Sequence, residues 1–283
     1  MRELMKCPNT NNYTIRSNSG WKVNEVWKKN TEQKVETQGD DVIDCVNMNN
    51  QLASNHGPIV DNTKDLKYAV VQSYGRLFGA SATFTVWKPE VEPNEFSLAQ
   101  IWITSGNGSN TNTIEVGWIA DNYNTTGCYD HDCVGFVQID FRIQPGQPIF
   151  PSTLGGQLTF LTIMVYKDGV NGHWWLEVNG ILIGYFPKNL FISLSEYAER
   201  VDFGGEILNK ENEGHHTTTQ MGNGLYAHEN GTSTVSEIRV YDQYRNPVEE
   251  RHEILITAAQ CYGALIFSNA IFYGGPGYSA ICP

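Results

Sequence analysis

The stretch Asn112-Thr113-Ile114-Glu115-Val116-Gly117-Trp118 alternates small or polar residues with large apolar ones. Alternation with a period of two is typical of a β-strand that has one face in a hydrophobic core. Thr113, Glu115 and Gly117 would then share one face, while the apolar residues anchor the other. The pattern predicts a strand that presents Glu115 away from the core, with Gly117 leaving room for a substrate backbone beside it.

Other runs of strand length occur from Lys67 onward, and turn-forming residues separate them. They cover residues 67–71, 82–87, 98–104, 135–143, 158–166, 173–178, 181–186, 235–241 and 253–257. Residues 189–200 carry the one helical pattern, with apolar side chains roughly on one face. Many short strands in a chain with only 18% charged residues predict an all-β fold, either a β-sandwich or an open barrel.

A second carboxylate has a similar setting in Val201-Asp202-Phe203-Gly204-Gly205-Glu206-Ile207-Leu208, where Glu206 follows two glycines and precedes two aliphatic residues. We expect a strand to hold it, with cleared space beside it. Two carboxyls in one groove cannot both ionise easily, so one pKa rises while the other falls. The ionised group could activate water and the protonated one could protonate a leaving group, which serves hydrolysis of a peptide or a glycoside. Spacing alone does not bring the two together, and two ordinary exposed strand glutamates are an equal alternative.

The charge distribution excludes several classes of partner. The chain has 283 residues and a net charge of −12. An acidic protein without a basic stripe is a poor ligand for nucleic acid or for an anionic membrane surface. No run of about 18 apolar residues exists that could form a transmembrane helix. Residues 1–66 are polar and rich in Asn, Lys, Thr and Gln, so we expect a less ordered N-terminal segment followed by the β-domain.

The six cysteines favour an oxidising compartment. Cys128 and Cys133 flank four residues, and Cys261 and Cys282 flank twenty, spacings that suit local disulfides. Free buried thiols are the alternative. Zinc is disfavoured because the histidines do not cluster at ligand spacing, although His131 lies between the first two cysteines.

Four Asn-x-Ser/Thr sequons also fit a secreted glycoprotein, at Asn12, Asn107, Asn124 and Asn230. The N-terminal residues 1–6 lack the apolar core of a signal peptide. We therefore expect that the natural leader is missing from this sequence and that the mature protein is extracellular or vacuolar.

The remaining polar motifs do not indicate another chemistry. No Ser or Cys is framed as a nucleophile. The pair His215-His216 lies in a polar stretch that could line a cleft, but an isolated pair is more typical of a surface feature than of a metal site. We expect neither a metal nor a cofactor. In Trp174-Trp175, strand alternation places Trp174 in the core and leaves Trp175 free to face a groove.

A resemblance to a known family follows from eight segments that occur in one order along the chain. They are residues 74–89, 94–102, 113–118, 127–138, 184–187, 203–206, 216–224 and 273–283. Together they resemble the neprosin family of plant proteins over about residues 68–283.

The resemblance implies an antiparallel β-sandwich of the glutamic-peptidase kind. It implies an acid endopeptidase that cuts at proline with two catalytic glutamates, which map onto Glu115 and Glu206. One would serve as general base on water and the other as acid. Gln100, Trp118 and Gln220 are candidates for contacts with substrate, chosen for strand parity and polarity. The expected partner is a peptide or protein substrate, and the expected state is a monomer.

The family also suggests how the chain is organised. Residues 36–60 are similar to the family's activation peptide, so residues 1–66 would form an activation segment of a zymogen and residues 67–283 the peptidase domain. Removal would follow cleavage between about residues 52 and 67. The implied disulfides are Cys128–Cys133 and Cys261–Cys282.

One departure from the family qualifies this interpretation. Only residues 119–127 separate Trp118 from Cys128, where the family carries a longer segment. Either the sequence lacks an exon, or this member has a trimmed and inactive groove. The second alternative predicts a non-catalytic binding module for cell-wall glycan or protein, which exposed aromatic side chains at Trp175 and Tyr185 would also suit. A glycosidase that uses the same two carboxylates is a third hypothesis.

Overall fold

The computed structural model describes residues 65–120, 135–211, 214–249 and 252–283, together with three earlier strands. The chain divides into two compact units. The first comprises Met1–Val60 with Cys128–Gln138, and contains strand β8 (Val137–Gln138) and an antiparallel sheet of order β1-β3-β2. The strands of that sheet are β1 (Tyr13–Ser17), β2 (Gln33–Glu36) and β3 (Val42–Asn47). The second unit comprises Asp61–Gly127 with Ile139–Pro283.

The role of residues 1–66 as an activation segment stays a prediction.

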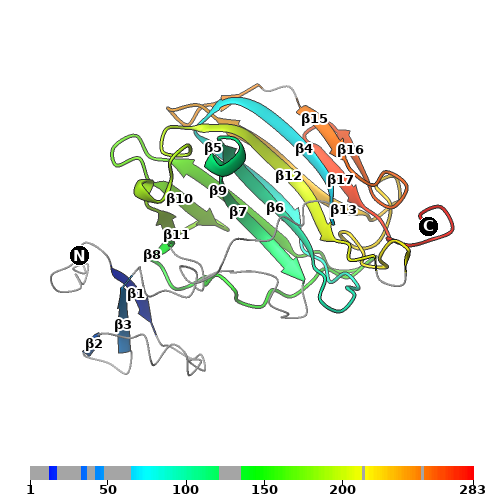
Figure 1. Cartoon of the computed structure of the whole chain (residues 1–283), viewed down its shortest axis with the longest axis horizontal. Coiled ribbons are helices and arrows are strands. Elements are labelled where there is room, and N and C mark those ends of the chain that lie inside the picture. Colours follow the sequence, from blue (N-terminus) through cyan, green and yellow to red (C-terminus); the bar gives the residue numbers. More distant parts are fainter. Residues whose placement is uncertain are drawn as a thin grey trace. The chain divides into compact units, whose positions relative to one another are not determined.

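The second unit consists of two antiparallel sheets (Figure 1). The five-stranded sheet has the order β15-β4-β12-β6-β7. Its strands are β15 (His252–Ile256), β4 (Leu66–Leu77), β12 (Ala198–Leu208), β6 (Ser97–Ser105) and β7 (Asn112–Ala120). The larger sheet runs β16-β17-β13-β5-β9-β10-β11, and β14 pairs with β13. Its strands are β16 (Gly263–Phe267), β17 (Ala270–Gly274), β13 (Ser233–Tyr241), β5 (Gly79–Thr85), β9 (Phe160–Lys167), β10 (Trp174–Val178), β11 (Ile181–Phe186) and β14 (Pro247–Val248). The predicted all-β antiparallel sandwich is confirmed.

The core lies between the two sheets, and we call the side of the five-stranded sheet that faces it the inner face. Several of its side chains are fully buried, for example Ile101, Ile103 and Phe203. Trp118 belongs to this face, because its Nε1 donates a 3.1 Å hydrogen bond to the carbonyl of Thr85 in the other sheet. The opposite side of the five-stranded sheet is the outer face.

The predicted helix over residues 189–200 is wrong. The structure has a short 3-10 turn at Lys188–Leu190, an irregular link, and then strand β12. Ser193 explains the link, because its hydroxyl lies within hydrogen-bond distance of the carbonyls of Ser105 and Asn110 and shares its one hydrogen between them. The backbone N–H groups of Ile192 and Ser193 both donate to the Asn112 side chain. Backbone and hydroxyl donors are therefore used in tertiary contacts rather than in a helical ladder.

The predicted strand over residues 135–143 is too long, because the structure has only the two residues of β8 in this range. Asp140 is the reason for its early end, because its carboxylate accepts from the backbone N–H and the guanidinium of Arg142. A local turn of this kind competes with sheet pairing.

The disulfide Cys261–Cys282 links the C-terminal residues to the turn that precedes β16. This pair is one of the two that were predicted, and the structure confirms it. The other pair, Cys128–Cys133, lies outside the described residues. The described part of the chain contains no helix with the length and apolarity needed to cross a membrane.

Candidate active site

Glu115 and Glu206 lie on the same face of the same sheet. Glu115 is on β7 and Glu206 is on β12, with β6 between these two strands. Glu115 pairs across the ladder with Trp102 of β6, and Glu206 pairs with Leu98 of the same strand. Directly paired residues of antiparallel strands point to the same side. Since Leu98 and Trp102 are an even number of positions apart, both glutamates project from the outer face.

Gln100 lies between the two glutamates on β6, two positions from each of their ladder partners. Its side-chain Nε2 donates a 2.8 Å hydrogen bond to Glu115 Oε2. This amide fixes the Glu115 carboxyl and favours its ionised form, because a carboxylate accepts a hydrogen bond more strongly than a carboxylic acid. The sequence candidates Glu115, Glu206 and Gln100 therefore converge on one surface.

A glycine on β7 explains how the Gln100 side chain is accommodated. Gly117 on β7 and Gly204 on β12 both pair with Gln100. A Cβ at position 117 would overlap the Gln100 side chain and the Ala99 carbonyl. Gly117 thus makes room for Gln100, whereas the sequence suggested room for a substrate backbone.

Of the two glycines before Glu206, only Gly204 faces the outer side. Gly205 is on the inner face, where a Cβ would come within 2.8 Å of Met221 and Tyr273. Gly205 therefore allows close packing of the two sheets, and it does not clear space beside Glu206.

Burial raises the pKa of both glutamates, and their neighbouring groups differ. Glu206 is only 6% exposed. Burial, and then the charge of Glu115, raise the pKa of Glu206 from 4.5 to about 8, while a hydrogen bond with Tyr68 opposes the rise. The Glu115 side chain is exposed at the residue level, yet the protein around its carboxyl displaces enough water to raise its pKa. The hydrogen bond from Gln100 lowers the pKa of Glu115 in turn. The charge of the other acid raises only the pKa of Glu206, whereas the hydrogen bond from Gln100 lowers only that of Glu115, so we assign the proton to Glu206.

A third acid on the outer face, Asp202, has a cation partner. Its carboxylate pairs with Arg200 at 3.0 Å and accepts from Gln72 Nε2 at 3.1 Å. Within the described ranges, neither Glu115 nor Glu206 takes part in an ion pair. An acid without a cation partner is available for proton transfer, and the two glutamates share that property.

Tyr68 is a site residue that the sequence reasoning missed. It pairs with Glu206 across the β4–β12 ladder and its ring meets Trp102 edge-on, with centroids 6.3 Å apart. Both rings belong to an apolar cluster that covers this part of the outer face together with Leu66, Val70, Phe96, Leu98 and Leu208. No local signal distinguishes Tyr68 from other strand tyrosines, because its partner is set by strand register.

The two remaining candidates lie elsewhere. Trp118 is buried on the inner face, on the opposite side of the sheet from Glu115. Gln220 is in a loop. Its side-chain Oε1 accepts a hydrogen bond from the backbone N–H of Glu90, and its backbone N–H donates to the carbonyl of Glu90. The structure shows no described contact between either residue and the glutamate pair.

The potential metal ligands that cluster in the described part of the chain are His216, Cys261 and Cys282. The two cysteine sulfurs are bonded to each other, so they cannot serve as thiolate ligands to zinc. The described cluster therefore does not form a metal centre in this oxidised state.

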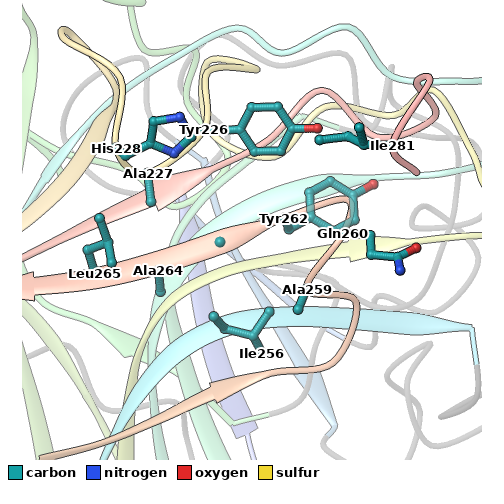
Figure 2. Close-up of a pocket in the computed structure, with 11 residues that line it drawn as sticks. Tyr226, Ala227, His228, Ile256, Ala259, Gln260, Tyr262, Ala264, Leu265 and Ile281 are labelled. Atoms are coloured by element: carbon teal, nitrogen blue, oxygen red, sulfur yellow. The ribbon is translucent and has the colours of Figure 1, made fainter.

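A separate hollow of about 710 Å³ lies at the edge strands β15 and β16. Figure 2 shows Tyr226 and His228 along one side and Ile256 along the other, and the lining is mostly apolar. Ile256 pairs with Ala69, an inner-face residue, so this hollow opens beside the interior of the sandwich and not on the outer face. None of its lining residues belongs to the glutamate site.

The fold and the site together define a β-sandwich protein with paired glutamates on one sheet. The Neprosin family model matches residues 118–276, which is more than half of the chain, so this chain belongs to the neprosin family. The family supports a peptidase-like function in general. The matched segment includes Glu206 and begins three residues after Glu115.

Proposed function

We propose that this protein is a secreted endopeptidase of the glutamic type, made as a zymogen, in which Glu115 and Glu206 hydrolyse proline-containing peptides. The observation that carries the proposal is the convergence of both glutamates on one face beside Gln100, with no cation partner in the described residues. Their unequal burial supports the division of roles that peptide hydrolysis needs.

Glu115 is the general base of this mechanism. Its side chain as a whole is more exposed than that of Glu206, and the hydrogen bond from Gln100 favours its ionised form. The Glu115 carboxylate takes a proton from water while the water oxygen bonds to the scissile carbonyl carbon. A tetrahedral intermediate results, with negative charge on the former carbonyl oxygen.

Glu206 is the general acid. Because its pKa is about 8, it carries a proton at acidic and neutral pH. It donates this proton to the leaving amide nitrogen as the C–N bond breaks, which gives a free amine and a carboxylic acid. The proton held by Glu115 then returns to Glu206 through solvent, which restores the starting state.

The strand spacing sets how the two glutamates are placed. Adjacent strands lie about 4.8 Å apart, so β7 and β12 are about 10 Å apart across β6. The β6 partners of the two glutamates, Trp102 and Leu98, are four positions apart, which adds about 13 Å along the strands. The glutamates therefore lie on a diagonal, and a peptide bond reaches both carboxyls where their side chains extend toward each other over Gln100. Gln100 lies in the gap and is placed to contact the substrate as well as Glu115.

The compartment and the partners complete the proposal. The Cys261–Cys282 disulfide favours an oxidising location, either extracellular or vacuolar. The proline preference and the activation segment come from the family resemblance. The protein is proposed to act as a monomer on peptides, without a metal or cofactor and without binding nucleic acid or membrane.

Cleavage of a proline-rich peptide library, followed by mass spectrometry across acidic to neutral pH, tests the proposal. Glu115→Gln and Glu206→Gln should each reduce cleavage to a small residual rate. Glu253→Gln, on the exposed strand β15 of the same sheet, is the matched control and should retain it. Full activity in either of the first two variants would remove the glutamate pair from the mechanism.

A second candidate function is a non-catalytic module that binds cell-wall glycan or protein. Trp175 and Tyr185 pair across β10 and β11 with ring centroids 4.7 Å apart, and His173 stacks on Tyr185 at 4.8 Å. The structure makes these rings half-buried rather than fully exposed, but an aromatic group of this kind suits stacking on sugar rings. Binding to a glycan array without turnover of any peptide would favour this function. Release of free sugar would instead favour a glycosidase that uses the same two carboxyls.

A further inference from the structure

The position of Tyr68 beside Glu206 is fixed from several sides. Its backbone N–H donates to Thr257 Oγ1 at 2.8 Å, and its carbonyl accepts from the Thr257 N–H at 3.1 Å. Its ring is held edge-on against Trp102 and packs on the apolar cluster of the outer face. A half-buried tyrosine restrained in this way has little freedom to turn its hydroxyl elsewhere.

Tyr68 and Glu206 are directly paired across the β4–β12 ladder, which places the Tyr68 hydroxyl beside the Glu206 carboxyl, within reach of a hydrogen bond. Burial and the nearby charges of Glu206 and Glu115 raise the pKa of Tyr68 well above its ordinary value, so the phenol stays protonated. Tyr68 is therefore a permanent donor, and Glu206 accepts from it in either ionisation state. The bond strengthens when Glu206 becomes a carboxylate, since hydrogen bonds to charged acceptors are stronger than those to neutral ones.

We propose that Tyr68 is a positioning residue, an inference that rests on the proposed function. Its hydroxyl donates to one oxygen of the Glu206 carboxyl, so the other oxygen carries the proton that is delivered to the leaving group. When that proton moves to the amide nitrogen, the electron pair of the O–H bond remains on Glu206 as a carboxylate. Tyr68 stabilises this new charge. The contribution grows along the reaction, so it accelerates the chemical step more than it tightens substrate binding.

Few other groups act on Glu206 in the described structure. The charge that acts on Glu206 is that of Glu115 on β7, while Asp202 on β12 acts on Tyr68 and is paired with Arg200. The β6 neighbour Gln100 is neutral and bonds to Glu115. Removing the Tyr68 hydroxyl therefore changes the surroundings of Glu206 without adding or removing a charge.

Tyr68→Phe tests the role, and Tyr74→Phe is the matched control. Tyr74 lies on the same strand and the same face, but its hydroxyl donates to Gln72 and not to Glu206. We expect Tyr68→Phe to lower kcat about ten-fold with little change in KM, because the stronger charged bond is lost in the transition state. In the wild type, the hydrogen bond from Tyr68 lowers the pKa of Glu206. Without this bond the pKa of Glu206 rises, so the alkaline limb of the pH–rate profile of Tyr68→Phe should move to higher pH. Tyr74→Phe should keep the wild-type values.

Carbon-13 NMR titration of the glutamate carboxyls gives a readout that does not depend on turnover. The Glu206 resonance, assigned with Glu206→Gln, should titrate at higher pH in Tyr68→Phe than in the wild type. An unchanged Glu206 titration, or a loss confined to KM, would overturn the role of Tyr68. If the wild type cleaves no peptide, the proposed function fails, and the NMR titration still decides whether Tyr68 tunes Glu206.

Discussion

Replacing Glu206 by Gln is expected to stabilise the fold at alkaline pH, although it removes the proposed general acid. Glu206 is 6% exposed, and its pKa in the folded protein is about 8 against 4.5 for an ordinary glutamate. Between these values the folded chain keeps a proton that the unfolded chain has lost. Because the folded state binds more protons there, its stability falls as the pH rises through this window.

The size of the effect follows from the same two values. Each unit by which the folded pKa exceeds the unfolded one corresponds to about 1.4 kcal/mol. The rise from 4.5 to about 8 therefore costs the wild type about 5 kcal/mol at alkaline pH. Gln has nearly the same shape and carries no charge, so the variant escapes this cost. Below pH 4.5 the wild-type side chain is neutral too, and the two proteins should agree to within about 1 kcal/mol.

Urea unfolding of both proteins at about pH 4 and about pH 8.5 measures the difference. Other groups, such as Asp168 and Asp242 with their lowered pKa values, shift both proteins equally and cancel in the comparison. Glu253→Gln, which changes an exposed glutamate, should track the wild type at both pH values. If the free-energy gap between Glu206→Gln and the wild type is the same at both pH values, the burial argument for Glu206 is refuted.

Three further predictions concern the same sheet. Gly117→Ala should displace the Gln100 amide from Glu115 and lower kcat, as steady-state kinetics would show; unchanged kinetics would mean that Gln100 does not support the base. Glu115→Gln should lower the pKa of Glu206, because the Glu115 charge raises it, and carbon-13 titration would detect the change or its absence. Trp118→Phe should destabilise the fold by about 1–3 kcal/mol by leaving a buried carbonyl of β5 without its donor. Urea unfolding measures that loss, and an unchanged midpoint would contradict the assigned hydrogen bond.

Local periodicity was enough to predict the strand that carries Glu115. The alternation in residues 112–118 places Glu115 and Trp118 on opposite faces, and the structure agrees, because side-chain direction in a strand depends on position along the chain alone. The same parity argument brings Gln100 into the site. The prediction of Trp118 as a substrate contact conflicts with its position on the face opposite Glu115, and the structure places its indole in the core.

Strand register was beyond the reach of the sequence. Tyr68 faces Glu206 because β4 and β12 pair with a particular offset, and no residue near Tyr68 reveals that offset. The two glycines before Glu206 look equivalent in sequence, yet one faces Gln100 and the other faces Met221 and Tyr273. Long-range contacts also overrode the apparent helix, since the Ser193 hydroxyl bonds to carbonyls of residues more than eighty positions away.

Glu115 and Glu206 are proposed to act together in one hydrolytic step. A double-mutant cycle on peptide cleavage tests this cooperation, with Glu115→Gln, Glu206→Gln and the double variant assayed on the same substrate. Residues that act as a unit are strongly non-additive, so the double variant should be no slower than the slower single variant. Losses that multiply as independent contributions, or substantial cleavage by either single variant, would contradict it.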